Sequence, residues 1–255
     1  MANSSDIILS VRQIEKTYHG RRVLENVSFD VRRGEVFVIM GGSGCGKSTM
    51  LRIMAGGVPP TSGKVFFNGQ DMSAVKGEAR EKIRRRFGMS FQSAALLDYL
   101  TVEENVSLPI KEHTRLAANI ISIMAQTKLN LVGLQGFAKF LPDELSGGMR
   151  KRAGLARAIA MDPEIVFYDE PTAGLDPVVC AVVDQLILDL TKKLQITSIV
   201  VTHNMESVFR IADRVAMLYQ GRLLQVGTAE EIKNTADPVV QQFIRGNIEG
   251  PIQMS

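Results

Sequence analysis

A glycine-rich segment from Gly41 to Thr49 carries the residues whose chemistry is easiest to interpret. It has the spacing G-x-x-x-x-G-K-S, between an apolar run at Val36–Met40 and a predicted helix at Lys47–Met54. Glycines leave room for an anion, successive backbone N–H groups can point at it, and the helix N-terminus adds positive partial charge. The pattern therefore predicts a loop for nucleotide phosphates, made of Gly41, Gly42, Ser43, Gly44, Cys45, Gly46, Lys47, Ser48 and Thr49.

Two side chains of this loop have distinct predicted roles. Lys47 can reach the β- and γ-phosphates, and the Ser48 hydroxyl can complete the coordination of Mg²⁺. A glycine turn with an incidental lysine is the alternative, so the rest of the chain must decide.

Two acids follow a second apolar run. The stretch Ile165–Pro171 contains Asp169 and Glu170, so a strand here would deliver both carboxylates at its C-terminal end. In a parallel sheet that end shares an edge with the phosphate loop. We expect Asp169 to hold Mg²⁺ through water and Glu170 to polarise the attacking water as a general base. An acid pair in an ordinary loop is the alternative.

A third stretch offers a second helix N-terminus for an anion. In LSGGMRKR, Leu145–Arg152, Ser146 can cap the helix that follows, while Gly147 and Gly148 allow close approach to exposed N–H groups. One active site needs only one phosphate loop. The surplus suggests a site that is completed by a second copy of the chain.

Apolar patterns predict the elements that position these residues. Ile7–Ile14 and Val23–Val31 alternate as strands with Tyr18 in their connection, and Gly63–Asp71 predicts a strand with a turn. Helical periodicity dominates 89–160, and strands alternate with helices from Ile165 onward. We therefore expect an α/β fold of the P-loop NTPase type, with a mostly parallel sheet, an antiparallel β flank and an inserted helical subdomain.

The predicted organisation is one domain over 1–255. Its nucleotide-binding core with the β flank comprises 1–88 and 161–235, its helical subdomain 89–160, and its C-terminal tail 236–255. We expect the last part of the tail, from Gly246, to be loosely held.

Composition excludes several classes of protein. A formal net charge of +3, from 30 basic and 27 acidic residues, does not favour nucleic-acid binding. No apolar stretch approaches membrane-helix length, and the N-terminus lacks the pattern of a signal peptide, so we expect neither. Cys45 and Cys180 are expected to be free thiols. Cys45 stands beside Lys47 at a helix N-terminus, which favours a thiolate, although a tolerated small residue is the simpler interpretation.

Taken together, these motifs resemble the ATP-binding cassette (ABC) family, the ATPase subunits of ABC transporters. The resemblance covers nearly the whole chain. The matching segments are GGSGCGKST with the Walker A loop, Gln92 with the Q-loop, LSGGM with the signature, IVFYDE with Walker B, AGLD (Ala173–Asp176) with the D-loop, and His203 with the switch histidine.

The resemblance implies an ATPase that works as a head-to-tail dimer, with ATP between the Lys47 loop of one copy and the Ser146 loop of the other. It implies that His203 contacts the γ-phosphate and orients Glu170, that Gln92 contacts Mg²⁺, and that Tyr18 stacks on adenine. Gln92 would also couple the nucleotide to a partner, through a groove near Gln92–Leu97. The sequence departs from the family at Met149 and Gly174, and the second change puts in doubt how the two sites communicate.

A narrower resemblance is to the ATPases of Mce-associated, Mla-type phospholipid transport systems. It rests on the segment after Gln92, on DELSGGMRKRAGLARAIA, and on the tail from Asp237 to Pro251. For this tail the resemblance implies a contact with the partner cassette. It implies an integral membrane permease and an Mce-type lipid-binding protein as partners, at the cytoplasmic face of the inner membrane. A small-solute importer ATPase, for example for amino acids, and a non-transport ABC ATPase acting on DNA or ribosomes are the alternatives. His113 is interpreted as a surface residue and not as a ligand.

Overall fold

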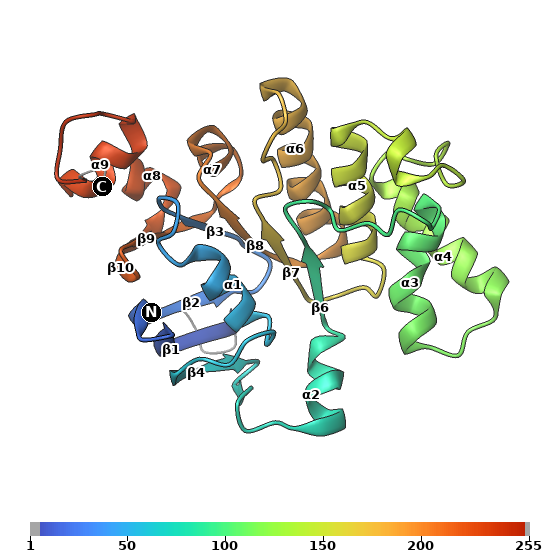
Figure 1. Cartoon of the computed structure of the whole chain (residues 1–255), viewed down its shortest axis with the longest axis horizontal. Coiled ribbons are helices and arrows are strands. Elements are labelled where there is room, and N and C mark those ends of the chain that lie inside the picture. Colours follow the sequence, from blue (N-terminus) through green and yellow to red (C-terminus); the bar gives the residue numbers. More distant parts are fainter. Residues whose placement is uncertain (1–5, 253–255) are drawn as a thin grey trace.

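The computed structural model describes residues 6–252, which form two sheets and a set of helices (Figure 1). The strands are β1 (Ile7–Tyr18), β2 (Arg21–Arg32), β3 (Val36–Met40), β4 (Ser62–Phe67), β5 (Gln70–Asp71), β6 (Phe87–Ser90), β7 (Ile165–Asp169), β8 (Thr197–Thr202), β9 (Arg214–Tyr219) and β10 (Arg222–Thr228). The helices are α1 (Lys47–Met54), α2 (Gly77–Arg84), α3 (Val102–His113), α4 (Ala118–Leu131), the short η2 (Pro142–Glu144), α5 (Gly147–Ala158), α6 (Pro177–Leu194), α7 (Met205–Ile211), α8 (Ala229–Lys233) and α9 (Pro238–Arg245).

The larger sheet has the order β10-β9-β3-β8-β7-β6. Every pair from β9 to β6 is parallel, and β10 joins the edge as the antiparallel arm of a hairpin. All residues of β3, β7 and β8 are buried, because other elements cover both faces of the sheet. This arrangement confirms the predicted α/β fold and its mostly parallel sheet.

Side chains of the central strands alternate between two apolar cores. In β3, Phe37 and Ile39 face the core that contains α1 and the antiparallel sheet β2-β1-β4-β5. Val38 and Met40 face the core formed with α3 to α7. The period of two along a strand places the helices and the antiparallel flank on opposite faces. The loop after β3 therefore leaves the sheet at an edge flanked by both layers.

The helices α3, α4 and α5 gather beyond the β6 edge, at the right of Figure 1. Thr101 begins α3 with a capping box, in which its hydroxyl accepts the N–H of Glu104 at 3.2 Å and the Glu104 carboxylate accepts the N–H of Thr101 at 2.8 Å. The buried Asn105 amide then bonds both backbone groups of Leu97, at 2.8 and 3.0 Å. The segment before α3 is thus held by α3 itself.

Three local features differ from the sequence-based expectations. The strand β1 runs on to Tyr18, which therefore ends a strand and does not lie in the connection, because Gln13 takes a positive φ of 49° at an irregularity and pairing resumes beyond it. The helix α2 was not predicted. The boundary predicted at residue 89 falls inside β6.

The chain after α9 is anchored, contrary to the expectation of a loosely held tail. The amide of Gln242 in α9 accepts the N–H of Ile252 at 2.7 Å and donates to the carbonyl oxygens of Asn247 and Ile252, both at 3.2 Å. The predicted core begins at residue 1 and the predicted tail ends at residue 255, but residues 1–5 and 253–255 lie outside the described residues. Within 6–252, no helix is long and apolar enough to cross a membrane.

Candidate active site

The loop between β3 and α1 has a backbone that only glycine fits at two positions. Gly41 has φ 151°, and a Cβ there would lie 2.1 Å from the Leu218 carbonyl oxygen of the neighbouring strand β9. Gly46 has φ 106°, and a Cβ there would lie 2.9 Å from the Val23 carbonyl oxygen in β2. The loop is therefore packed tightly between the two sheets at both of its ends.

The ammonium group of Lys47 folds back over this loop. It donates to the carbonyl oxygens of Gly41 at 2.8 Å and Gly42 at 3.0 Å, and the side chain is buried. A cation is thus held directly above the backbone turn at the N-terminus of α1. Ser43 and Gly44, at the tip of the turn, remain exposed. Such a concave, positively polarised loop suits a phosphate chain.

The phosphate loop and the acid strand meet at one edge of the sheet, as the sequence suggested they would. The Ser48 hydroxyl donates to Oδ1 of Asp169 at 3.0 Å, and the Asp169 carboxylate is buried. Gln92 lines a cavity of about 520 Å³ together with Asp169. Hydroxyl, amide and carboxylate oxygens are hard ligands that suit Mg²⁺.

Few protein ligands are needed for such an ion. Among residues 6–252, no three His, Cys, Asp or Glu side chains gather as a ready-made metal cage. A site with Ser48, Gln92 and Asp169 fits a magnesium ion whose remaining ligands come from phosphates and water. The residues present therefore fit the predicted Mg²⁺.

Glu170 and His203 contact each other where β7 and β8 end. Nδ1 of His203 lies 2.9 Å from Oε1 of Glu170, and the His203 backbone N–H donates to Oε2 at 3.4 Å. Glu170 is buried and has a left-handed φ of 49°, whereas the His203 side chain is 59% exposed. The carboxylate is thus fixed from within the protein while the imidazole faces outward. A base and an orienting group are therefore in hydrogen-bond reach.

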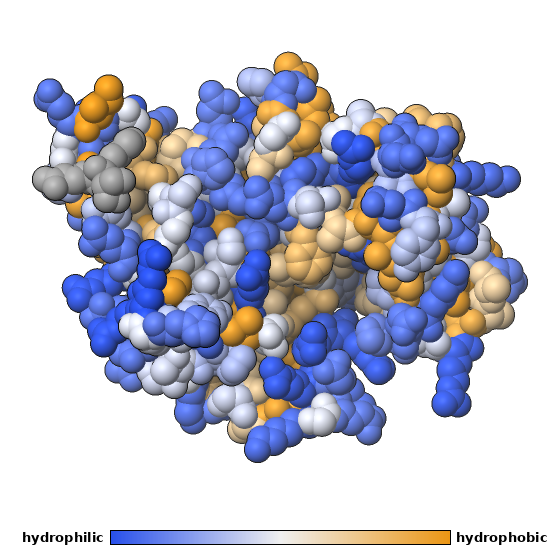
Figure 2. All heavy atoms as spheres, in the orientation of Figure 1, coloured by the Kyte–Doolittle hydropathy of each residue, from blue (hydrophilic) through white to orange (hydrophobic). Residues whose placement is uncertain are grey.

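Figure 2 draws the face of Figure 1 as a surface. Figure 2 shows a hollow near the middle of the face, with apolar side chains gathered between hydrophilic surfaces. The cavity beside Asp169 is also lined by Phe91, Ala173 and Gly174. The predicted Q-loop and D-loop segments therefore border the same space as the acid strand.

The Ser146 turn caps α5. Its hydroxyl accepts the N–H of Met149 at 3.3 Å, and both Ser146 and Gly147 are exposed. A Cβ at Gly148 would lie 2.6 Å from Cγ1 of Val179 in α6, so this glycine is required by packing. No hydrogen bond found in residues 6–252 joins Ser146 to the phosphate loop. The N-terminus of α5 is thus free to face something other than its own chain's nucleotide loop.

Tyr18 has a different environment from the other predicted residues. Its ring is 39% exposed, and the ammonium of Lys16 lies 4.8 Å from the ring centroid. Lys16 pairs across the sheet with Leu24, whose side chain packs against Gly46. The Tyr18 ring is therefore partly open to solvent, at the end of a strand whose neighbour β2 packs against the phosphate loop.

The two cysteines are free and buried. Burial raises the pKa of the Cys45 thiol, and this effect outweighs the nearby charge of Lys47. The expectation that the helix N-terminus favours a thiolate is therefore wrong for Cys45. Burial also raises the pKa of Cys180.

A family model described as ABC transporter matches residues 24–173, which include the phosphate loop, the Ser146 turn and the acid strand. The chain belongs to the ABC transporter family. The predicted enzyme class, an ATPase, is confirmed with the family.

This ABC ATPase is similar to curated proteins over nearly its whole length. The intermembrane phospholipid transport system ATP-binding protein MlaF of Haemophilus influenzae is 39% identical over 246 residues, which cover 96% of this chain and 93% of the relative. The probable ribonucleotide transport ATP-binding protein of Mycobacterium leprae is 39% identical over 249 residues, which cover 98% of this chain and 72% of the relative. The narrower resemblance noted from the sequence is thus confirmed.

Solved structures agree with this assignment. A dimeric ATP-binding cassette in a post-hydrolysis state, bound to ADP and Pi, matches with a TM-score of 0.80 and 32% identity. The match covers 87% of this chain and 99% of that chain. The same fold therefore binds nucleotide as a dimer in another cassette.

The structure of this ABC ATPase also shows two residues beside the site that the sequence interpretation did not identify. Lys151 donates to the carbonyl oxygens of Gln92 and, at 3.4 Å, of Glu170. Arg157 donates to the carbonyl oxygens of Ala95 and Ala94, both at 2.7 Å. Both lie on α5, directly after the LSGGM motif. Basic residues follow this motif in the sequence, but nothing there indicates which backbone oxygens they reach.

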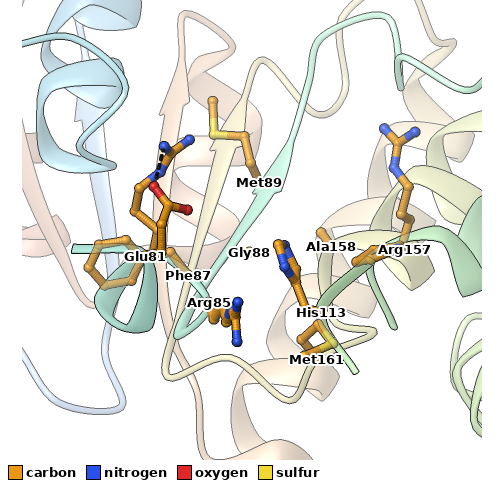
Figure 3. A pocket seen from close by; sticks show the side chains of 11 residues that line it. Glu81, Arg85, Phe87, Gly88, Met89, His113, Arg157, Ala158 and Met161 are labelled. Carbon is orange, nitrogen blue, oxygen red and sulfur yellow. Dashed lines mark hydrogen bonds and ion pairs between the residues drawn. The ribbon is translucent and has the colours of Figure 1, made fainter. Parts of the chain in front are cut away.

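A second cavity lies on the other side of β6, away from the acid strand. It has a volume of about 320 Å³ and lies between α2, β6, the end of α3 and α5 (Figure 3). Phe87 and Met89 of β6 line it, and Arg85, His113 and Arg157 surround it. It lies just before Gln92–Leu97, where the sequence predicted a groove. Leu96 itself packs against the core and is only partly exposed. The groove near Gln92–Leu97 stays a prediction.

Proposed function

We propose that this chain is the ATP-hydrolysing motor subunit of a membrane transporter that moves phospholipid between envelope membranes. The observation that carries the hydrolytic part is the meeting of Lys47, Ser48, Asp169, Glu170 and His203 at one edge of the sheet. The phospholipid substrate is supported by full-length similarity to a phospholipid transport ATP-binding protein. Members of its family bind ATP, so the cofactor of this chain is ATP.

The residues of the chain divide the work of hydrolysis. The loop from Gly41 to Thr49 holds the phosphates through its N–H groups, and Lys47 turns its ammonium from the Gly41 and Gly42 oxygens toward the β- and γ-phosphates. Glu170 takes a proton from the attacking water at its carboxylate. His203 keeps that carboxylate in place through Nδ1 and leaves Nε2 to contact the γ-phosphate.

Mg²⁺ is the metal proposed for this site. When bound, the ion neutralises charge on the β- and γ-phosphate oxygens. Ser48, Gln92 and Asp169 are its proposed ligands, with Asp169 acting through water. The Asp169 carboxylate keeps the Ser48 hydroxyl in position.

The proposed working form is a head-to-tail dimer with ATP shared between two copies. The exposed N-terminus of α5, with Ser146, Gly147 and Gly148, is the surface that would meet the partner's nucleotide. The dimeric cassette with ADP and Pi supports this arrangement. The tail 236–255, and within it Asp237–Pro251, is proposed to add a contact between the copies. Tyr18 is proposed to stack on the adenine ring.

An integral membrane permease and an Mce-type lipid-binding protein are the proposed partners. The cavity of Figure 3 supports the first. Phe87 and Met89 give it an apolar part, and its basic side chains outnumber its one acid, Glu81, so it suits an amphipathic permease segment that carries an acidic residue. The helices of 89–160 are proposed to act as a subdomain that moves with this contact, against a core of 1–88 and 161–235. The chain is then peripheral, at the cytoplasmic face of the inner membrane.

The shared pocket is tested at Ser146. In the complete transporter, Ser146→Arg should abolish cooperative hydrolysis, because the bulky cation blocks the approach of two copies, while ATP binding to the isolated chain persists. Ser43→Arg in the loop itself should abolish both. If hydrolysis by Ser146→Arg remains cooperative and as fast as in the wild type, the shared pocket does not exist and the motor proposal fails.

One alternative substrate, a ribonucleotide, is also supported by a comparison. The relative named as a probable ribonucleotide transporter is as similar as the phospholipid one. The complete complex should be purified, and bound lipid and nucleotide identified by mass spectrometry. Co-purifying phospholipid, together with lipid movement between vesicles that requires ATP, supports the proposal. Ribonucleotide uptake without lipid movement would favour the importer.

A further inference from the structure

The loop from Gln92 to Ala95 has a strained backbone that is held from α5. Ala94 and Ala95 have successive left-handed φ values of 62° and 48°, which residues with a side chain rarely adopt. Such a conformation persists only where the surroundings impose it. The carbonyl oxygens of both alanines accept from the guanidinium of Arg157 at 2.7 Å.

Residues three apart along α5 make the other contacts with this loop. A Cβ at Gly154 would lie 3.1 Å from the Cβ of the buried Ala94, so the helix and the loop are in close contact there. About one turn closer to the N-terminus of the helix, the Lys151 ammonium donates to the carbonyl oxygen of Gln92. The loop therefore lies against α5 along two turns of the helix.

Lys151 has a second partner outside the loop. The same ammonium donates to the carbonyl oxygen of Glu170 at 3.4 Å. Glu170 is itself left-handed, at φ 49°, so its carboxylate position depends on backbone contacts that fix this conformation. One cation thus joins two strained segments, which come from opposite sides of the cavity beside Asp169.

We propose that Lys151 is a positioning residue that couples the conformation of the Gln92–Ala95 loop to the position of Glu170. The inference rests on the proposed function, since it assigns Glu170 the role of base. Arg157 connects the same loop to the cavity of Figure 3, which it lines. A displacement at that cavity reaches the loop through Arg157 and reaches Glu170 through Lys151.

The first test measures the coupling itself in the full-length chain. Lys151→Met keeps the length and apolar stem of the side chain but removes its donors. Amide hydrogen exchange should then increase at both 92–96 and 170–174, while exchange in β3 and β8 stays as in the wild type. Lys192→Met is the matched control, because Lys192 is an exposed lysine near the end of α6. A uniform rise over the whole chain would indicate a general folding defect and would overturn the positioning role.

The second test measures turnover by the complete transporter. Lys151→Met should lower kcat about tenfold or more and leave KM for ATP within about twofold, because the phosphate loop is untouched. Lys151→Arg, which retains charge and donors, should recover most of the loss. Lys151→Met and Arg157→Met should be non-additive in kcat, because both act on one loop.

The possible outcomes distinguish a failure of the proposed coupling from a failure of the proposed function. Wild-type turnover in Lys151→Met, beside an inactive Glu170→Gln, would overturn the inference alone. Wild-type turnover in Glu170→Gln would overturn the proposed function and the inference with it. Equal losses in Lys151→Met and Lys151→Arg, without a local change in exchange, would also reject the coupling.

Discussion

The imidazole of His203 and the carboxylate of Glu170 lie 2.9 Å apart, although the two residues are separated by 33 positions in the sequence. Adjacent parallel strands bring them together, because Asp169 at the end of β7 pairs with Val201 in β8. The contact therefore depends on the register of the sheet, and each residue can be tested without disturbing the other's strand.

Glu170→Gln should retain ATP binding and lower kcat by about two orders of magnitude or more, because the amide cannot accept the proton from water. The same variant should trap the dimer when ATP is added, which size-exclusion chromatography can detect. His203→Ala should also lose turnover, but a smaller loss is expected if orientation is its main contribution. Turnover of Glu170→Gln at the wild-type rate would contradict the assignment of the base.

Gly41→Ala should destabilise the protein by about 2 kcal/mol or more, because the new Cβ would meet the Leu218 carbonyl at 2.1 Å and φ is 151°. Gly42→Ala is the matched control for stability, since a Cβ there has nothing within 4 Å. Urea unfolding of both variants measures the difference. Equal free energies of unfolding would mean that the backbone at Gly41 adapts freely.

Tyr168→Phe should be neutral or stabilising by about 1 kcal/mol, because no hydrogen bond of normal geometry is found for the buried Tyr168 hydroxyl among residues 6–252. Burial raises the pKa of Tyr168 to about 12 from 10.0. The folded state therefore keeps this proton longer than the unfolded state, so wild-type stability falls as the pH rises from about 10 to 12. The advantage of the variant in urea unfolding should widen over that range. A clear loss of stability at pH 7 would imply that the hydroxyl is satisfied.

Arg85→Gln should weaken assembly with the permease and leave ATP binding by the isolated chain unchanged, because Arg85 lines the cavity of Figure 3 and lies far along the chain from the phosphate loop. Co-purification of the complex and nucleotide titration measure the two effects. Lys82→Gln serves as the control, since Lys82 in α2 is exposed and pairs with Glu78. Full assembly of the Arg85 variant would place the permease elsewhere.

Sequence reasoning succeeded where local pattern and chemistry coincide. The apolar runs at Val36–Met40 and Ile165–Asp169 predicted both strands correctly, and the position of the two acids at the end of the second strand followed from them. The loop could also be recognised from its glycines, because glycine adopts backbone dihedral angles that other residues avoid. Gln220 and Gly221, which join β9 to β10, also have positive φ.

The misses have physical causes. In α2 only Ile83 is buried, so its highly charged sequence has no apolar periodicity to reveal a helix. The strand β6 is four residues long and is stabilised by pairing with β7, which lies far along the chain. A local sequence pattern therefore does not reveal it. The influence of Lys47 on Cys45 could be named from the sequence, whereas the larger influence on the pKa of this thiol, its burial, depends on the fold. Lys151 and Arg157 bind backbone oxygens, which leave no trace in the pattern of residue types.

The position of β3 between β8 and β9 has a consequence for folding during synthesis. The ribosome delivers the phosphate loop early, but the two strands that flank β3 emerge only with the C-terminal quarter of the chain. Until then a fully apolar strand has no neighbours, and such long-range pairing is slow and prone to aggregation. A nascent or truncated product that stops before Tyr219 therefore holds the signature loop without a working nucleotide pocket. We therefore expect the yield of intact subunit to depend on how well aggregation is avoided before β8 and β9 are available.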